Sequence, residues 1–333
     1  MRIVLGLSGG VDSSAAARLL LDEGHEVIGA YLDIGQSAEP VVTAARELGI
    51  RLEIIDIRQQ LEDLVCRPFR EAYLSGKTPN PCVRCNPLVK FPALLELADR
   101  LGAEHVATGH YARVAFEDGA YRLYSAKSGN DQSYMLCMLP QDILSRLILP
   151  LGEFEKTETR RIASCAGLSA SSRPDSMEIC FIPDNDYAAY IERFAGKLPA
   201  GDLIDKNGRV IGRHEGIHRY TIGQRRGLGF AAGERVYVGG INVENNTVSL
   251  VPEAELLTDR FETQLPHWTV RAPSFPLECQ VKVRHSKTML AAALSPTPTG
   301  LSVTLGKAVR RPSPGQTAAF YLGDEVLGGA EIL

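Results

Sequence analysis

The chain has 333 residues, of which 44% are hydrophobic and 23% charged, and its formal net charge is −4. This composition is typical of a globular protein, and the length allows two or three domains. No run of eighteen apolar residues occurs, and the N-terminus lacks the basic and apolar pattern of a signal peptide. Seven cysteines, an odd number, argue against a secreted disulfide framework, so we expect a cytoplasmic protein.

The first segment, Arg2–Leu7, is apolar and β-branched, which predicts a buried parallel strand. It is followed by Ser8-Gly-Gly-Val-Asp-Ser13 and by a helical pattern from Ser14 to Gly24. Two glycines let the backbone approach a ligand, and the helix N-terminus adds partial positive charge, so the loop predicts a phosphate site. It is not a Walker A loop, because no Gly-Lys-Ser/Thr follows, and we expect no lysine to reach a γ-phosphate. The alternative is an ordinary glycine-rich turn.

Strand and helix patterns then alternate, which predicts an α/β domain with a doubly wound parallel sheet and a ligand at the carboxyl ends of the strands. Tyr111–Ser125 is typical of a hairpin turning at Asp118-Gly119, and Ile143–Gly167 has a mostly helical pattern. The expected strands are Glu26–Ile34, Arg51–Ile57 and His105–Thr108, and the expected helices are Glu39–Gly49, a segment ending near Leu74, and Leu88–Leu101.

The pattern changes near Leu198, where short polar and apolar alternations separated by Gly, Asn and Pro begin. From there we expect two small β domains, with a helical pattern only at Thr288–Leu294. The expected boundaries are 1–197 for the α/β domain with the phosphate loop, 198–257 for a central β domain and 258–333 for a barrel-like C-terminal domain.

Basic residues concentrate in two windows, 206–226 and 282–311, while the rest of the chain is acidic. Such a surface suits a polyanion that must bind in one place, and solvated basic faces are the alternative. The residues are Lys206, Arg209, Arg213, Arg219, Arg225 and Arg226, and Lys282, Arg284, Lys287, Lys307, Arg310 and Arg311.

Cys82 and Cys85 form a Cys-x-x-Cys pair in a proline-rich loop, and Cys180 lies in Asp175-Ser-Met-Glu-Ile-Cys-Phe-Ile182. No second pair exists, which argues against a four-cysteine zinc site. Thiol chemistry and an iron–sulfur cluster held by three thiolates both remain open.

The loop Ser8–Ser13 resembles the PP-loop of ATP pyrophosphatases, which cleave ATP to AMP and pyrophosphate and adenylate a substrate oxygen. With six further motifs in the same order, the chain resembles the tRNA-specific 2-thiouridylases over almost its whole length. The motifs are Thr78–Asn86, Ala107–Arg113, Asp131–Tyr134, Asp175–Ile182, Tyr220–Gly229 and Ser313–Tyr321.

The resemblance implies that ATP with Mg²⁺ adenylates the 2-oxygen of the wobble uridine in tRNA, with lysine, glutamate and glutamine tRNAs as the expected substrates. Sulfur then displaces AMP. It implies that Cys180 carries the sulfur as a persulfide supplied by a cysteine desulfurase or a sulfur-relay protein. Cys85 is then the second thiol, which either releases sulfide or closes a Cys85–Cys180 disulfide.

The resemblance also implies the binding residues. ATP is expected at Gly6, Leu7, Ser8, Gly9, Gly10, Val11, Asp12 and Ser13, flanked by Leu32 and Gly109, with Mg²⁺ at Asp12. The flipped target base is expected at Asn80, Pro81 and Cys82. Further tRNA contacts are expected at His110, Asn130, Asp131, Gln132, Arg284, His285 and Gln316.

Two features depart from the family pattern. Cys82 occupies a position where the family usually has aspartate, so it is a [4Fe–4S] ligand beside Cys85 and Cys180, a dithiol partner of Cys85, or a passive replacement. The segment Asp33–Glu39 is also short, so contacts to the adenine can differ there. Two other functions stay open: a PP-loop ligase acting on a small metabolite, and a non-catalytic iron–sulfur or RNA-binding protein.

Overall fold

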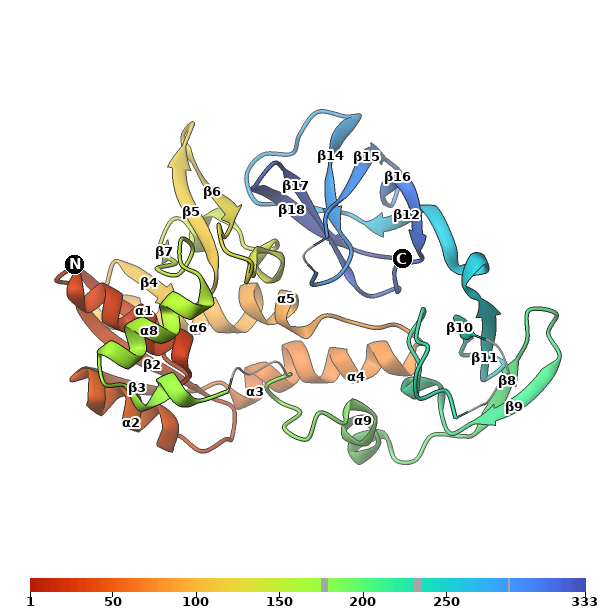
Figure 1. Ribbon diagram of the computed structural model, residues 1–333, viewed down its shortest axis with the longest axis horizontal. Helices are drawn as coiled ribbons and strands as arrows, with labels where there is room; N and C mark the ends of the chain where they lie inside the picture. Colours follow the sequence, from red (N-terminus) through yellow and green to blue (C-terminus); the bar gives the residue numbers. More distant parts are fainter. Residues whose placement is uncertain (175–178, 230–234, 287) are drawn as a thin grey trace.

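The computed structural model describes residues 1–174, 179–229, 235–286 and 288–333. Its N-terminal part is built on a five-stranded parallel sheet in the order β3-β2-β1-β4-β7 (Figure 1). This confirms the α/β prediction. The strands are β1 (Arg2–Gly6), β2 (Glu26–Asp33), β3 (Arg51–Asp56), β4 (His105–Thr108) and β7 (Leu147–Ile148).

Helices cover both faces of this sheet, as a doubly wound fold requires. Ile3 and Leu5 of β1 pack with α1 (Val11–Asp22), α2 (Glu39–Leu48) and α8 (Lys156–Cys165). Val4, which points to the opposite face, packs with α6 (Phe91–Leu101). All three side chains of β1 are fully buried, which is why the strand is apolar without alternation.

The mostly helical pattern expected for Ile143–Gly167 is wrong in its first half, because β7 and non-helical residues lie between α7 (Gln141–Leu144) and α8. A two-residue strand is too short to produce a period, so its pairing with β4 is visible only in the fold. The remaining helical segments connect the layers. They are α3 (Arg58–Leu61), the π-helical turn η1 (Glu62–Cys66), α4 (Arg67–Leu74), α5 (Pro81–Cys85), the π-helical turn η2 (Asn86–Lys90), α9 (Tyr187–Ala195), and the 3₁₀ turns η3 (Ser133–Leu136) and η4 (Ser169–Ser172).

The hairpin is confirmed: β5 (Ala112–Glu117) and β6 (Ala120–Ser125) turn at Asp118 and Gly119, whose φ angles are +52° and +79°. It does not extend the parallel sheet. Instead β6 pairs with β18 of the C-terminal domain.

Two small β domains follow, as expected (Figure 1). The central sheet has the order β10-β11-β8-β9 and the C-terminal sheet the order β12-β16-β15-β14-β17-β18-β6-β5, with β13 on β18. The central elements are β8 (Gly201–Ile204), β9 (Val210–His214), η5 (Ile217–Arg219), β10 (Val236–Asn242), β11 (Thr247–Pro252) and η6 (Glu253–Leu256). The C-terminal strands are β12 (Leu257–Gln264), β13 (His267–Trp268), β14 (Leu277–Lys282), β15 (Leu290–Pro296), β16 (Gly300–Arg310), β17 (Thr317–Leu322) and β18 (Glu325–Glu331).

The helical pattern expected at Thr288–Leu294 is wrong, because Leu290–Pro296 forms β15. This strand is hydrogen-bonded on both edges, to β14 and to β16. Ala292 and Leu294 are buried, whereas Ala291 and Ala293 are more exposed. Tertiary pairing therefore overrides the helix propensity of the alanine run.

Candidate functional site

The phosphate loop joins β1 to α1 and presents a helix N-terminus. Gly10 is the N-cap of α1, so no N-cap side chain bonds to the backbone N–H groups of the first helical turn. Gly9 has a φ of +76°, and a Cβ there would lie 2.6 Å from the Pro40 carbonyl carbon. The loop thus needs glycine at this position, and its free helix end can bind an anion.

The loop lies where the strand order reverses, between β1 and β4. Gly109 follows β4, and a Cβ at this position would lie 2.8 Å from the Asp12 carbonyl carbon and from the Ser13 nitrogen. Ligands of open α/β sheets bind at such a switch point, so Gly6–Ser13 and Gly109 are brought together as expected. Leu32 lies in β2 and packs partly buried against the core, and its contact with adenine stays a prediction.

A lysine from another helix lies at the loop, although the loop itself contains none. Lys156 of α8 pairs with Asp12, its Nζ lying 2.7 Å from Oδ1 and 2.8 Å from Oδ2. The Tyr111 hydroxyl also donates to Asp12 Oδ1, at 2.8 Å. Helix α8 packs against α1, and only this packing brings Lys156 to a loop 144 residues earlier in the sequence.

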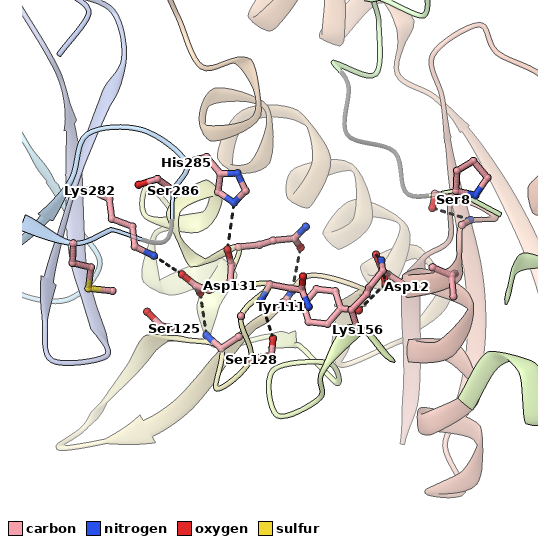
Figure 2. A pocket seen from close by; sticks show the side chains of 18 residues that line it. Ser8, Asp12, Tyr111, Ser125, Ser128, Asp131, Lys156, Lys282, His285 and Ser286 are labelled. Carbon is pink, nitrogen blue, oxygen red and sulfur yellow. Dashed lines mark hydrogen bonds and ion pairs between the residues drawn. The ribbon is translucent and has the colours of Figure 1, made fainter. Parts of the chain in front are cut away.

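A cavity of about 640 Å³ extends from the phosphate loop to the C-terminal domain (Figure 2). Of the expected tRNA contacts, Asn130, Asp131, Gln132 and His285 line it together with Ser8, Gly10, Val11 and Asp12. Figure 2 shows Asp12 and Lys156 at one end and Lys282 and His285 at the other. The structure therefore joins motifs that are far apart in the sequence, and their contact with tRNA stays a prediction.

Two of these side chains, Asp131 and Gln132, make contacts within the protein. Asp131 pairs with Lys282 at 2.6 Å and also accepts the backbone N–H groups of Ala126 and Ser133. Gln132 Oε1 accepts the backbone N–H of Tyr111 at 3.1 Å.

Fewer basic side chains of the two windows than expected are free to bind a polyanion. The Lys282 side chain is only 4% exposed and is neutralised by Asp131. Lys206, Arg213, Arg219 and Arg310 are likewise paired, with Glu255, Asp202, Glu192 and Glu253. Arg225, Arg226 and Arg284 are exposed, and Lys287 lies outside the described residues.

The proline-rich loop is held by all three domains. Asn80 Oδ1 caps α5 by accepting the N–H groups of Cys82 and Val83. Thr78 contacts the central domain through Thr221 Oγ1 at 3.1 Å, and its carbonyl accepts the Gln316 side chain at 2.8 Å. Gln316, expected at the tRNA, therefore also positions the loop. The expected base contacts Asn80, Pro81 and Cys82 sit on this held segment.

The three thiols of interest lie near one another. Cys82 and Cys85 are on the single turn of α5, and Cys85 packs in one apolar cluster with Phe181, the neighbour of Cys180. Burial raises the pKa of Cys82 and Cys85, and burial together with both thiols raises that of Cys180 to about 11. Cys82 and Cys180 are nevertheless exposed, so reagents can reach them.

The iron–sulfur cluster expected at Cys82, Cys85 and Cys180 is not supported. Among the described residues, no three Cys, His, Asp or Glu side chains are grouped so that they could hold a metal ion. All seven cysteines are free thiols. Residues 175–178 of the motif that contains Cys180 lie outside the described part of the chain.

His110 contacts both the last residue of β4 and Lys90. Its Nδ1 lies 2.7 Å from Thr108 Oγ1, and its Nε2 lies 3.5 Å from Lys90 Nζ. Burial, and secondarily Lys90, holds the pKa of His110 well below its usual value, so the ring is neutral.

Family models match almost the whole chain. Residues 1–184 match a tRNA methyl transferase HUP domain, residues 188–252 a tRNA methyl transferase PRC-barrel domain, and residues 258–332 an aminomethyltransferase beta-barrel domain. A tRNA-specific 2-thiouridylase MnmA of Chlorobium luteolum is 42% identical to the chain, covering 99% of it and 96% of the relative. The chain belongs to the tRNA-specific 2-thiouridylase family.

Other members of the 2-thiouridylase family are similarly close. The MnmA protein of Heliobacterium modesticaldum is 40% identical and that of Syntrophotalea carbinolica 41%, each over 99% of this chain. The matches cover 92% and 98% of these relatives.

No described helix is long and apolar enough to cross a membrane.

Sequence reasoning missed several residues of this 2-thiouridylase site. Lys156, Lys90 and Gln36 were not expected there, although Gln36 in the short segment after β2 donates to the Cys180 carbonyl at 2.7 Å. Lys90 alone had a local signal, because it lies five residues after Cys85 on the same helical run. The other two are placed by tertiary packing.

Proposed function

We propose that the chain is an ATP-dependent tRNA-uridine 2-sulfurtransferase, which replaces the 2-oxygen of a wobble uridine by sulfur. The observation that carries this proposal is the Gly109-His110 turn. Gly109 packs on the phosphate loop, and His110 contacts Lys90 next to the thiols. A base placed at this turn would have an activating phosphate on one side and a sulfur nucleophile on the other.

The first step is adenylation. The uridine 2-oxygen attacks the α-phosphorus of ATP, the bond to the β-phosphate breaks, and pyrophosphate leaves. The backbone N–H groups of the loop and the Lys156 ammonium would stabilise the negative charge on the phosphates. Since a lysine does reach the loop, cleavage between the α- and β-phosphates now rests on family membership alone. Asp12 has the oxygen chemistry that Mg²⁺ prefers, and a metal ion bound there would share this carboxylate with Lys156 and neutralise phosphate charge.

The second step is sulfur transfer. The terminal sulfur of a Cys180 persulfide bonds to C2 and AMP leaves with the C–O electron pair. The Cys85 thiolate then attacks Cys180 Sγ, the S–S bond to the transferred sulfur breaks, and its electron pair stays on the 2-thiouridine. If Cys85 attacks first, sulfide is released and itself displaces AMP. Both orders end in a Cys85–Cys180 disulfide that an external dithiol reduces.

The binding roles follow from the same proposal. Asn80, Pro81 and Cys82 would contact the flipped uridine, and Asn130, Asp131, Gln132, His110, Arg284, His285 and Gln316 the surrounding tRNA. The sulfur would come from a cysteine desulfurase or a relay protein, and the tRNAs would be those for lysine, glutamate and glutamine. Seven free thiols fit the reducing cytoplasm that we propose as the compartment.

The test is reconstitution with ATP, unmodified tRNA and a persulfide donor, followed by mass spectrometry of the nucleosides. We expect one AMP for each 2-thiouridine, and no product from Cys180→Ser or Cys85→Ser. Formation of ADP and inorganic phosphate contradicts the proposal. AMP release with a small metabolite in place of tRNA favours a PP-loop ligase instead.

A further inference from the structure

Lys90 is a half-buried cation at the C-terminal end of η2. Its ammonium lies 3.5 Å from His110 Nε2, and none of the described carboxylates pairs with it. Lys156 and Lys282, by contrast, each have an acidic partner, Asp12 and Asp131. A half-buried cation that no carboxylate neutralises can balance negative charge on another nearby group.

The contact with His110 cannot supply that charge, because the buried imidazole is neutral. One tautomer fits both of its contacts: Nδ1–H donates to Thr108 Oγ1, and Nε2 accepts from the Lys90 ammonium. His110 therefore orients Lys90 without neutralising it. Thr108 is buried at the end of β4, so this orientation is built on the rigid central sheet.

Three thiols lie close enough to Lys90 to be affected by its charge. The Lys90 charge opposes the effect of burial on the pKa of Cys82, Cys85 and Cys180. For Cys85 the backbone N–H of Lys90 acts in the same direction, while the Cys66 and Cys82 thiols raise its pKa. Residues 86–90 form a π-helical turn, whose i→i+5 bonding brings Lys90 closer to the face of Cys85 than an α-helix would.

We propose that Lys90 is the cation of the sulfur-transfer centre, held by His110 so that its ammonium stabilises negative charge on sulfur at Cys85 and Cys180. This rests on the proposed sulfurtransferase function for its purpose, although the effect on the thiols exists without tRNA. The Cys85 thiolate is needed before it attacks Cys180, and the same charge then resides on the departing sulfur. A fixed ammonium favours both species without any change in its own protonation.

The test measures thiol reactivity in the resting protein, without ATP or tRNA. Iodoacetamide labelling of Cys85 and Cys180 is followed by peptide mass spectrometry between pH 7 and pH 10 for wild type, Lys90→Met, Lys90→Arg and Lys197→Met. Lys197 is an exposed lysine after α9 and serves as the matched control. We expect Lys90→Met to slow labelling of Cys85 about tenfold at pH 7.5 and to move its pH profile upward. Lys90→Arg should keep most of the rate, and Lys197→Met should match wild type.

Equal labelling rates in Lys90→Met and wild type overturn the inference. If Lys90→Met fails to fold, Lys90→Gln keeps a polar end without charge and gives the same comparison. A merely structural role predicts that Lys90→Met and Lys90→Arg behave alike, with no change in the pH profile. Failure of the proposed sulfurtransferase function can be distinguished from failure of this inference. In the first case wild type makes no 2-thiouridine, while the labelling difference between wild type and Lys90→Met persists.

Discussion

At the scale of single residues, Asp12 has contacts that the sequence did not predict. Its carboxylate accepts hydrogen bonds from Lys156 and from the Tyr111 hydroxyl. If Lys156 binds phosphate when ATP enters, Lys156→Met should lower AMP formation by roughly 10²-fold, the effect of removing one preorganised donor. Asp12→Ala should abolish AMP formation while the fold survives. Radiolabelled ATP and chromatography measure the product.

The matched control is Lys127→Met, since Lys127 is an exposed lysine whose partner is Glu153. It should form AMP at the wild-type rate. An unchanged rate in Lys156→Met would show that the lysine only balances Asp12.

At the scale of elements, the proline-rich loop and α5 form a segment that contacts from the other two domains hold in place. It bears Cys82 and Cys85, yet it has no sheet partner, and its position depends on contacts from Thr221 and Gln316. Gln316→Ala and Thr221→Val should each lower stability by about 1 kcal/mol, the value of one hydrogen bond. Both should slow 2-thiouridine formation several-fold more than they slow AMP formation, because the thiols shift relative to the phosphate loop.

Gln280→Ala is the control, because this glutamine accepts the backbone N–H of Gly323, which lies at the opposite end of β17 from Gln316. It should change neither rate. If Thr221→Val leaves thiolation intact while Gln316→Ala does not, Gln316 acts through tRNA and not through the loop.

At the scale of the whole molecule, the Lys282–Asp131 pair joins the C-terminal domain to the catalytic domain. Their side chains are 4% and 15% exposed, so removal of one partner leaves a buried charge. Lys282→Met should destabilise the protein by about 3–5 kcal/mol in urea unfolding. Adding Asp131→Asn should recover part of this loss. A Lys282→Met protein as stable as wild type would contradict the assignment.

The binding of tRNA also belongs to the whole molecule. We expect affinity to fall by roughly 10³-fold between about 50 and 200 mM salt if several phosphates are contacted. Arg225→Ala with Arg226→Ala should weaken binding and leave ATP affinity unchanged, because both side chains are exposed. Arg46→Ala with Arg100→Ala, on the helices that cover the sheet, is the control. Filter binding across a salt series makes the comparison, and salt-insensitive binding would contradict it.

The sequence alone determined the parts that depend on near neighbours. The apolar run of β1, the glycines of the phosphate loop and the Asp118-Gly119 turn each follow from local sterics and hydrogen bonding, and the structure has all three. The order of the motifs was sufficient to predict the family, and the patterns of strands and helices were sufficient to predict an α/β fold followed by two β domains.

Only the tertiary structure decided which distant side chains meet. Lys156 and Asp12 are 144 residues apart, Lys282 and Asp131 are 151 apart, and Gln316 and Thr78 are 238 apart. The same packing made a strand of Leu290–Pro296 and put the basic side chain of Lys282 in the interior. Such contacts depend on how helices and sheets pack, and packing leaves no periodic pattern around either partner in the sequence.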